Sequence, residues 1–153
     1  METGQMEELA WKIATEAFKN KVDKGGKPYL DHMKRIVFYM NENQETQDEE
    51  LNCIAILHDL IEDCDEWKIS NLIPLFTERI ITAVDILTKK EKQSYNNYLE
   101  LIASNRDAVC VKLNDLKDNM DITRLNEVTN MDTKRLDKYL QAHKYLTEVK
   151  NNK

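Results

Sequence analysis

The chain has 153 residues and a formal net charge of −6, from 22 Lys and Arg against 28 Asp and Glu. Hydrophobic residues make up 41% and charged residues 33%, which is typical of a water-soluble globular protein. This length suits one domain with its own core, so we expect a single domain over residues 1–153. The acidic balance argues against general binding to nucleic acid.

Membrane insertion, secretion and disulfide bonding are not expected either. No stretch approaches the roughly 20 apolar residues that a membrane span needs. The first eight residues are acidic and lack the apolar core of a secretory signal. Cys53, Cys64 and Cys110 show no CxxC spacing, which favours free thiols and a cytoplasmic location. Nothing in the sequence indicates an oligomeric state.

Helices are predicted along nearly the whole chain, because only three Gly and two Pro interrupt it. Apolar residues recur at helical spacing over residues 4–20 and 29–41, with a break at Gly25-Gly26 and Pro28. A polar loop is expected over 41–47. The remaining helices are expected over 48–63, 67–75, from Thr77 through Leu87, over 95–102, over 107–124, and from a cap at Thr133 through Leu146. The predicted fold class is therefore all-α, a compact bundle of about seven to nine helices.

Charge is unevenly distributed along the chain. Residues 19–35 hold six basic and two acidic side chains, whereas residues 41–66 hold ten acidic side chains and no Lys or Arg. A basic segment and an acidic segment could frame an anionic substrate and a cation respectively. Ordinary surface charge would give the same pattern.

The most informative stretch is His58-Asp59-Leu60-Ile61-Glu62-Asp63, which directly follows the apolar run Cys53-Ile54-Ala55-Ile56-Leu57. Four titratable side chains in six residues are costly beside a core unless something binds them. A divalent metal ion is the simplest candidate. The alternative is a solvated acidic helix face with one histidine in the core.

Two further polar features accompany this stretch. Asp115 and Asn119 lie four residues apart beside Leu113 and Leu116, so the Asp115 carboxylate is expected to point partly inward and to need a cation or hydrogen-bond donors. His32 follows Pro28 at the head of a predicted helix. A single histidine there is more often structural than a metal ligand.

Taken together, His32, His58, Asp59 and Asp115 follow the order seen in the HD superfamily of metal-dependent phosphohydrolases, which this chain resembles. Lys24 to His32 is similar to the "KGGxPYxxH" of the hydrolase domain of RelA/SpoT proteins and of small alarmone hydrolases. Ala55 to Cys64 is similar to their "AxLHDxxEDT", Leu87-Thr88 to "LT", and Val111 to Met120 to "VKLADxxxNM". The resemblance covers roughly residues 8–147 and includes a tyrosine of the last helix, Tyr139. It implies a helical HD-domain bundle.

The resemblance also implies roles for individual residues. His32, His58, Asp59 and Asp115 would hold one divalent metal ion, with Mn²⁺ as the expected metal, although this ligand set also suits iron or zinc. Glu62 and Asp63 would be catalytic, positioning or deprotonating the attacking water. Lys24, Asn119 and Tyr139 would bind the substrate.

The implied activity is hydrolysis of the 3′-pyrophosphate of guanosine tetra- or pentaphosphate, with no synthetase domain. The expected partner is an anionic nucleotide, without nucleic acid or membrane. One alternative is a phosphohydrolase of the same fold that acts on another nucleotide, such as NADPH or a nucleoside monophosphate. A second alternative is a nucleotide-binding protein with little turnover.

The sequence departs from the family pattern at several positions. Phe18 stands where members usually have a histidine, and we expect that position to lie behind the metal ligands or to face the substrate rather than to bind the metal, so that the metal site is retained. Asp23 replaces a basic residue that packs on the purine, which brings the preference for guanine into question. Asn114 replaces an alanine, and Asp118 adds an acid that would weaken the binding of a highly anionic ligand.

Overall fold

The computed structural model describes residues 2–42 and 47–152, and within those ranges the chain is helical with no strand beyond one isolated bridge between Val22 and Pro28. The helices are α1 (Gln5–Ala17), α2 (Leu30–Asn41), α3 (Glu49–Leu57), α4 (Leu60–Asp63), α5 (Ile69–Leu72), α6 (Glu78–Leu87), α7 (Tyr95–Ala103), α8 (Arg106–Asn119), the 3-10 helix η1 (Ile122–Arg124) and α9 (Asn130–Asn151). The predicted all-α class and the approximate number of helices are confirmed.

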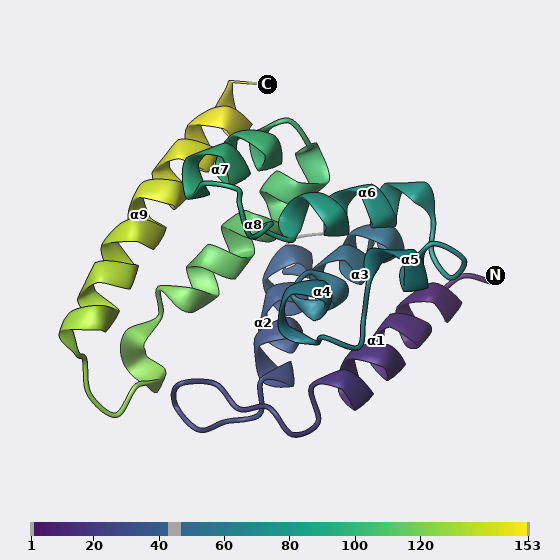
Figure 1. Cartoon of the computed structure of the whole chain (residues 1–153), viewed down its shortest axis with the longest axis horizontal. Helices are drawn as coiled ribbons and strands as arrows, with labels where there is room; N and C mark the ends of the chain where they lie inside the picture. Colours follow the sequence, from purple (N-terminus) through teal and green to yellow (C-terminus); the bar gives the residue numbers. More distant parts are fainter. Residues whose placement is uncertain (1, 43–46, 153) are drawn as a thin grey trace.

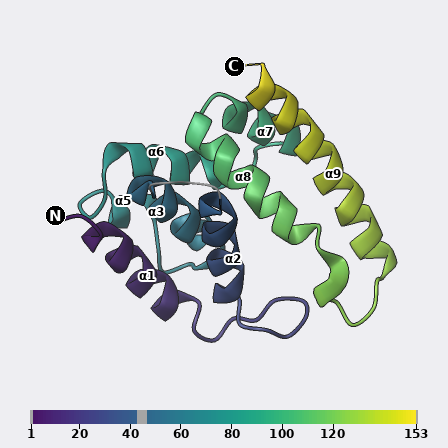
Figure 2. The same cartoon turned by 180° about the vertical axis from the view of Figure 1, so that it is seen from behind.

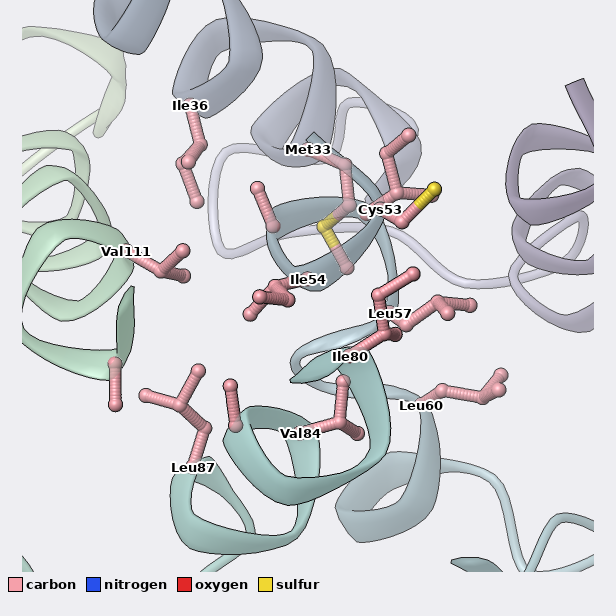
Figure 3. Packing of buried hydrophobic residues seen from close by; sticks show 14 of the residues in the cluster. Met33, Ile36, Cys53, Ile54, Leu57, Leu60, Ile80, Val84, Leu87 and Val111 are labelled. Atoms are coloured by element: carbon pink, nitrogen blue, oxygen red, sulfur yellow. The ribbon is translucent and has the colours of Figure 1, made fainter. Parts of the chain in front are cut away.

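Helix α3 is the centre of the core. Its residues Cys53 through Leu57 have no exposed surface, so this half of the helix is buried on all sides, as a helical segment that is apolar all round must be. Helices α1, α2, α6 and α8 pack around it. Figure 3 shows Ile54 and Leu57 of α3 among Met33 and Ile36 of α2, Ile80 and Val84 of α6, and Val111 of α8. His58 directly follows this apolar helix and is therefore buried in the interior.

The long helix α9 forms one edge of the molecule. It packs along α8 and touches α7, and it runs as the yellow-green outer helix in Figures 1 and 2. The connection from α8 to α9 passes through η1 at the same end of the molecule as the loop between α1 and α2. A side-chain carbon added to Gly25 in that loop would lie 2.5 Å from the carbonyl oxygen of Arg124, so these two connections are in close contact.

The predicted central helix over 48–63 is wrong in one respect, because it is interrupted at His58-Asp59. Helix α3 ends at Leu57, and α4 begins at Leu60 after an Asp59 with φ −102° and ψ −1°. Adjacent residues of a regular helix project about 100° apart. Because the helix is interrupted, this angle does not apply to His58 and Asp59, and both of their side chains lie in the same polar cluster.

Other predicted boundaries also shift. The helix expected over 67–75 is reduced to α5, and the one expected over 107–124 ends at Asn119 before η1. The cap expected at Thr133 is formed by Thr129, whose hydroxyl accepts from the Asp132 N–H while the Asp132 carboxylate accepts from the Thr129 N–H. Most of the loop expected over 41–47 lies outside the described residues. No helix in the described ranges is long and apolar enough to cross a membrane.

Candidate metal centre

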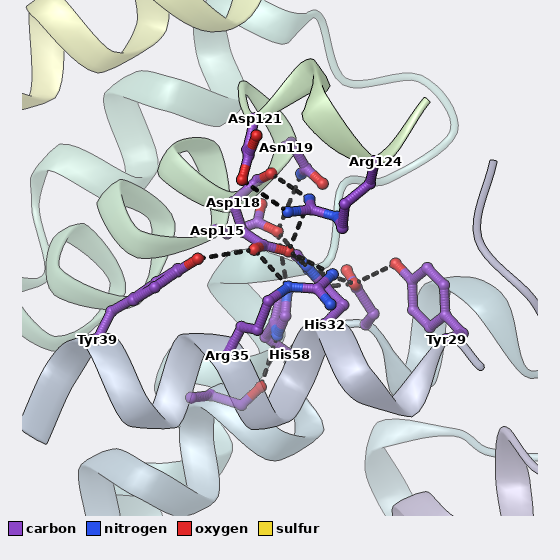
Figure 4. Close-up of polar contacts among 12 residues, drawn as sticks. Tyr29, His32, Arg35, Tyr39, His58, Asp115, Asp118, Asn119, Asp121 and Arg124 are labelled. Carbon is purple, nitrogen blue, oxygen red and sulfur yellow. Dashed lines mark hydrogen bonds and ion pairs between the residues drawn. The ribbon is translucent and has the colours of Figure 1, made fainter. Parts of the chain in front are cut away.

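Four side chains from separate elements meet in the interior between α2, α3 and α8. His32 comes from α2, His58 follows α3, Asp59 precedes α4 and Asp115 comes from α8. One ligand atom from each lies within 4.8 Å of all the others. The Nε2 atom of His32 is 2.8 Å from Asp115 Oδ1, and the Nε2 atom of His58 is 3.1 Å from Asp59 Oδ2 and 3.3 Å from Asp115 Oδ1 (Figure 4). The geometry thus brings together all four of the predicted ligands.

Both imidazole rings are held through their Nδ1 atoms. His32 Nδ1 lies 2.6 Å from Asp118 Oδ2, and His58 Nδ1 lies 2.6 Å from the carbonyl oxygen of Ala55. Because a carboxylate and a carbonyl only accept, each Nδ1 must carry the proton that it donates. The Nε2 atoms are left facing the two carboxylates, which is the tautomer a metal-binding histidine needs.

The carboxylates of the cluster favour positive charge at its centre. Burial alone would lower the pKa of His32, but hydrogen bonds with Asp115 and Asp118 raise it to about 9. Burial likewise opposes charge on His58, yet the Asp59 charge and the hydrogen bond with Asp115 raise its pKa well above the usual value. Two added protons supply the same charge as one divalent cation. The donor set of two imidazoles and two carboxylates therefore fits such an ion in charge as well as in arrangement.

The two carboxylates are oriented by other side chains. The Tyr29 hydroxyl donates to Asp59 Oδ2 at 2.7 Å. Asp115 accepts from Lys112 Nζ at 3.0 Å and from Asn119 Nδ2 at 3.1 Å. Burial would raise the pKa of Asp115, but the Lys112 charge and the hydrogen bond with His32 hold it well below its ordinary value. Asp115 is thus ionised and fixed in place.

A cleft of about 440 Å³ opens beside the cluster, with His32 and Tyr29 in its wall. It lies where the loop before α2, the end of α8, η1 and the start of α9 come together. All three residues predicted to bind substrate line it: Lys24, Asn119 and Tyr139. Its basic lining residues also include Arg35, Arg124 and Arg135.

Glu62 and Asp63 lie on the exposed side of α4, next to the cluster along the chain. Glu62 Oε1 accepts from the backbone N–H of Lys89 at 2.9 Å, which ties α4 to the residues that follow α6. Partial burial, followed by the charges of Asp59 and Glu62, raises the pKa of Asp63 to about 6. Asp63 can therefore exchange a proton close to neutral pH.

Comparison with known proteins identifies this architecture. No family model matches the chain, and no curated protein matches it by sequence. A solved structure of a metazoan orthologue of SpoT, described as hydrolysing ppGpp and playing a role in starvation responses, aligns with a TM-score of 0.76 at 20% identity, covering 97% of this chain and 87% of the other. The chain has the HD-domain fold.

In this fold, Phe18 is a packing residue rather than part of the cleft. It is 2% exposed, and its ring stacks on Tyr29 with the centroids 5.2 Å apart. Tyr29 in turn donates to Asp59, so Phe18 supports the cluster through one intermediate. The expectation that this position lies outside the ligand set agrees with the geometry.

Asp23 organises the loop that carries Lys24. Its Oδ1 atom accepts from the backbone N–H groups of Gly25 and Lys27, both at 2.9 Å, and its own N–H donates to the Lys27 carbonyl at 2.8 Å. This is the local side-chain bonding that makes aspartate a turn former. A basic residue could not accept these bonds, so the loop depends on the acid.

Asp118 was misjudged from the sequence. It is fully buried, and it accepts from His32, from Arg35 Nε at 2.6 Å and from the Tyr39 hydroxyl at 3.1 Å, with Arg124 Nη2 at 3.4 Å (Figure 4). Burial opposes its charge, but the bonds with His32 and Arg35 lower its pKa. Its charge is therefore neutralised, and its effect is to orient His32 rather than to repel an anion.

If the cluster holds the expected divalent metal ion, replacing Asp118 with asparagine should weaken binding of that ion, tested with Mn²⁺, by about 10- to 100-fold, the usual effect of losing a partner that orients a metal-binding histidine. The amide cannot match a carboxylate that receives His32 and two arginines at once. Titration calorimetry would measure the change. Asp121→Asn is the matched control, because Asp121 lies on the same cleft, pairs with Arg124 and does not touch His32. Equal affinities for the two variants would contradict the role given to Asp118.

Proposed function

We propose that the protein is a metal-dependent phosphohydrolase that removes the 3′-pyrophosphate of guanosine tetra- or pentaphosphate. The observation that carries this proposal is the buried group of His32, His58, Asp59 and Asp115 beside a cleft lined by Lys24, Asn119 and Tyr139. The shared fold with a hydrolase of ppGpp supports the choice of substrate. The cleft wall holds four basic side chains and four aspartates, and of the basic ones Lys24 is the one not paired with an aspartate, which makes it the expected contact for an anionic nucleotide.

The four ligands would hold one divalent ion. We infer Mn²⁺ from the family resemblance, since the mixed imidazole and carboxylate set suits iron or zinc as well. Such an ion lowers the pKa of water and stabilises the charge that develops on a phosphoryl group. The protein's own contribution is orientation. Asp118 and the Ala55 carbonyl fix the two imidazoles, while Tyr29 and Lys112 fix the two carboxylates.

Substrate binding is assigned to the cleft. Lys24 makes no hydrogen bond or ion pair with another described residue, and burial, followed by the charge of Arg135, lowers its pKa. Its ammonium group is therefore available to a phosphate. Arg35, Arg124 and Arg135 are each paired with an aspartate of the cleft, so they add less net attraction. Asn119 bridges the two parts of the site, because it lines the cleft and donates to Asp115.

Glu62 and Asp63 are proposed to position the attacking water and to take its proton. Both are carboxylates on α4, immediately after the ligand Asp59, and both are open to solvent. A base with a pKa near 6 is well matched to proton transfer at neutral pH.

The pH dependence of turnover tests Asp63. Because its pKa is about 6 and the active form is the ionised one, kcat should rise as the pH increases through about 6 and should be lost below it. In Asp63→Asn this acidic limb should be absent, and the remaining rate should be low at every pH. Steady-state rates between pH 5 and 8 at saturating Mn²⁺ would show this. An unchanged limb in the variant would assign it to another group.

The second candidate is a phosphohydrolase of the same fold that acts on another nucleotide, such as NADPH or a nucleoside monophosphate. Asp23 favours it, because this acid lines the cleft at the position where the resembling family has a basic residue that packs on the purine. Asp23 also builds the loop, so Asp23→Asn is the informative variant. It retains one acceptor oxygen and removes the charge.

The sequence and the structure together support proposals for the domain organisation and the location of the protein. We infer one domain over residues 1–153 and a cytoplasmic location, the latter because the three cysteines are free. An alarmone hydrolase with these properties would act in the stringent response. No nucleic-acid or membrane partner is proposed.

The deciding experiment is a product assay with added Mn²⁺ on guanosine 3′-pyrophosphates, NADPH and nucleoside monophosphates. Pyrophosphate released from the guanosine 3′-pyrophosphates alone would support the proposal. Orthophosphate from NADPH or a monophosphate would establish the second candidate. No product from any of these, with metal bound, would overturn both.

A further inference from the structure

Helix α4 carries both of the proposed catalytic carboxylates, yet it has only four residues. A helix this short is not stable alone, because a single turn closes too few hydrogen bonds to offset the ordering of its backbone. Its place must therefore be set by contacts with other parts of the chain. These contacts include the buried side chain of Leu60, the bond from the Lys89 N–H to Glu62, and a bond from Lys21 to Asp63.

The bond from Lys21 reaches the very end of α4. Lys21 lies in the loop between α1 and α2, and its Nζ atom donates to the main-chain carbonyl oxygen of Asp63, 42 residues further along the chain. Asp63 is the last residue of α4, and the last carbonyl groups of a helix have no partner within the helix. A lysine ammonium is a suitable donor to such a carbonyl, and its charge suits the negative end of a helix. Lys21 thus caps α4 at the residue that carries the proposed base.

The main chain of Lys21 is itself fixed. The Tyr29 N–H donates to the Lys21 carbonyl oxygen at 2.9 Å, next to the isolated bridge that closes the same loop. The Tyr29 hydroxyl donates in turn to the proposed metal ligand Asp59. Lys21 therefore stands at the base of the loop that carries Lys24, and it joins this loop to α4.

A neighbouring lysine lacks this connection. Lys19 and Lys21 line the same groove, which is formed by one face of α1 together with Glu66 and Trp67. The ammonium group of Lys19 bonds to Glu16, three residues away on the same side of the groove. Both lysines are exposed, and an exposed contact of this kind adds little to overall stability. The bond from Lys21 matters for where α4 lies rather than for whether the protein folds.

We propose that Lys21 is a positioning residue for the reaction, because its bond to the end of α4 holds Glu62 and Asp63 in place beside the metal centre. The inference rests on the proposed function and adds to it a residue that touches neither the metal nor the substrate. A displacement of about 1 Å in a reacting group can lower a rate by about 10²-fold. The four metal ligands lie outside α4, so a shift of α4 should slow turnover without weakening the metal site.

The test compares Lys21→Met, which removes the ammonium group, with Lys21→Arg, which keeps a cationic donor. In Lys21→Met, kcat should fall by about tenfold or more, while KM and the Mn²⁺ affinity stay within about twofold of the wild type. Lys21→Arg should restore kcat to within about threefold of the wild type. Lys19→Met is the matched control and should keep full kcat, because Lys19 lines the same groove without bonding to α4.

Hydrogen exchange in the absence of substrate follows α4 independently of any activity. The N–H groups of Asp63 and Cys64 donate to the carbonyl oxygens of Asp59 and Leu60, both at 3.0 Å. Their exchange should be about threefold or more faster in Lys21→Met, since the end of the helix opens more often. It should be unchanged in Lys19→Met.

The rates are measured on whichever nucleotide of the product assay the wild type hydrolyses, which separates the inference from the proposed function. An unchanged kcat of Lys21→Met overturns the inference and leaves the proposed function standing. Unchanged exchange in α4, a loss of kcat that Lys21→Arg does not relieve, or a loss that accompanies weaker Mn²⁺ binding also overturns it. The expected pattern on NADPH or a monophosphate supports the inference and rejects the guanosine substrate. No turnover by the wild type overturns both.

Discussion

Replacing Asp59 with alanine is expected to abolish high-affinity Mn²⁺ binding and to reduce turnover by about a thousandfold or more. Asp59 supplies one of the two carboxylates of the cluster, 3.1 Å from His58 Nε2 and held by Tyr29. Without it, the remaining donors carry only the charge of Asp115 toward a divalent ion. The loss of the metal would remove both the activation of water and the stabilisation of phosphoryl charge.

The effect on stability separates this loss from simple misfolding. Mn²⁺ at about 100 times its dissociation constant stabilises a folded protein by about 2.7 kcal/mol, which for this length raises Tm by roughly 5–10 °C. Asp59→Ala should show no such rise, and its metal-free Tm should be lower than that of the wild type, because the hydrogen bond with Tyr29 and the attraction to His58, which lowers the pKa of Asp59, are both lost. Differential scanning fluorimetry with and without Mn²⁺ measures both quantities.

The control is Asp85→Ala, which removes a half-exposed aspartate paired with Lys90 at the surface. Surface ion pairs contribute little, so this variant should keep both the metal-induced rise in Tm and full turnover. A normal rise in Tm for Asp59→Ala would remove it from the ligand set. Full turnover without bound metal would refute a metal-dependent reaction altogether.

Replacing Glu62 with glutamine should lower the rate without weakening metal binding, whereas Asp59→Ala should lose both. The amide keeps the acceptor oxygen that meets the Lys89 N–H at 2.9 Å, so the position of α4 should be preserved. Loss of the carboxylate removes a base near the attacking water, and general-base catalysis contributes about 10²- to 10⁴-fold. We therefore expect kcat to fall by that factor while the Mn²⁺ affinity and the metal-induced rise in Tm stay the same.

Glu66→Gln is the matched control, because Glu66 is another exposed glutamate just beyond α4 and no role is proposed for it. Its kcat should equal that of the wild type. If Glu62→Gln loses Mn²⁺ affinity together with rate, Glu62 belongs to the metal site and not to proton transfer. If it keeps its full rate, Asp63 alone must carry the proton.

The resemblance to HD phosphohydrolases predicted which residues would meet at the metal centre but not how they are held. His58 and Asp59 were found because two titratable residues directly follow an apolar helix, which is a local signal. Asp118 looked like a surplus acid, since its bond with His32 spans 86 residues of sequence. The pairing of Lys112 with Asp115, three residues apart on α8, was not predicted either, because the sequence does not show that both side chains are largely buried.

The helix boundaries likewise include some that the sequence predicted and some that it did not. The apolar spacing of residues 29–41 predicts α2 closely, because helical periodicity depends on residues three and four apart. The interruption at His58-Asp59 was missed, since apolar residues continue through it to Leu60 and Ile61. There the His58 imidazole bonds to the Ala55 carbonyl of its own helix, and the side chains turn toward Asp115 of α8.

By itself, the sequence determined the all-α class, most of the helices and the set of polar residues able to hold a metal. Each of these follows from local spacing or from the order of short motifs. Only the tertiary structure decided that Asp118 orients His32, that Phe18 supports Tyr29, that Asp23 builds the Lys24 loop, and that Lys21 bonds to the end of α4. The physical reason is that the free-energy cost of a buried polar group depends on its hydrogen-bond partners. Packing brings those partners together from distant parts of the chain, and helical periodicity, which depends on residues close in sequence, does not indicate them.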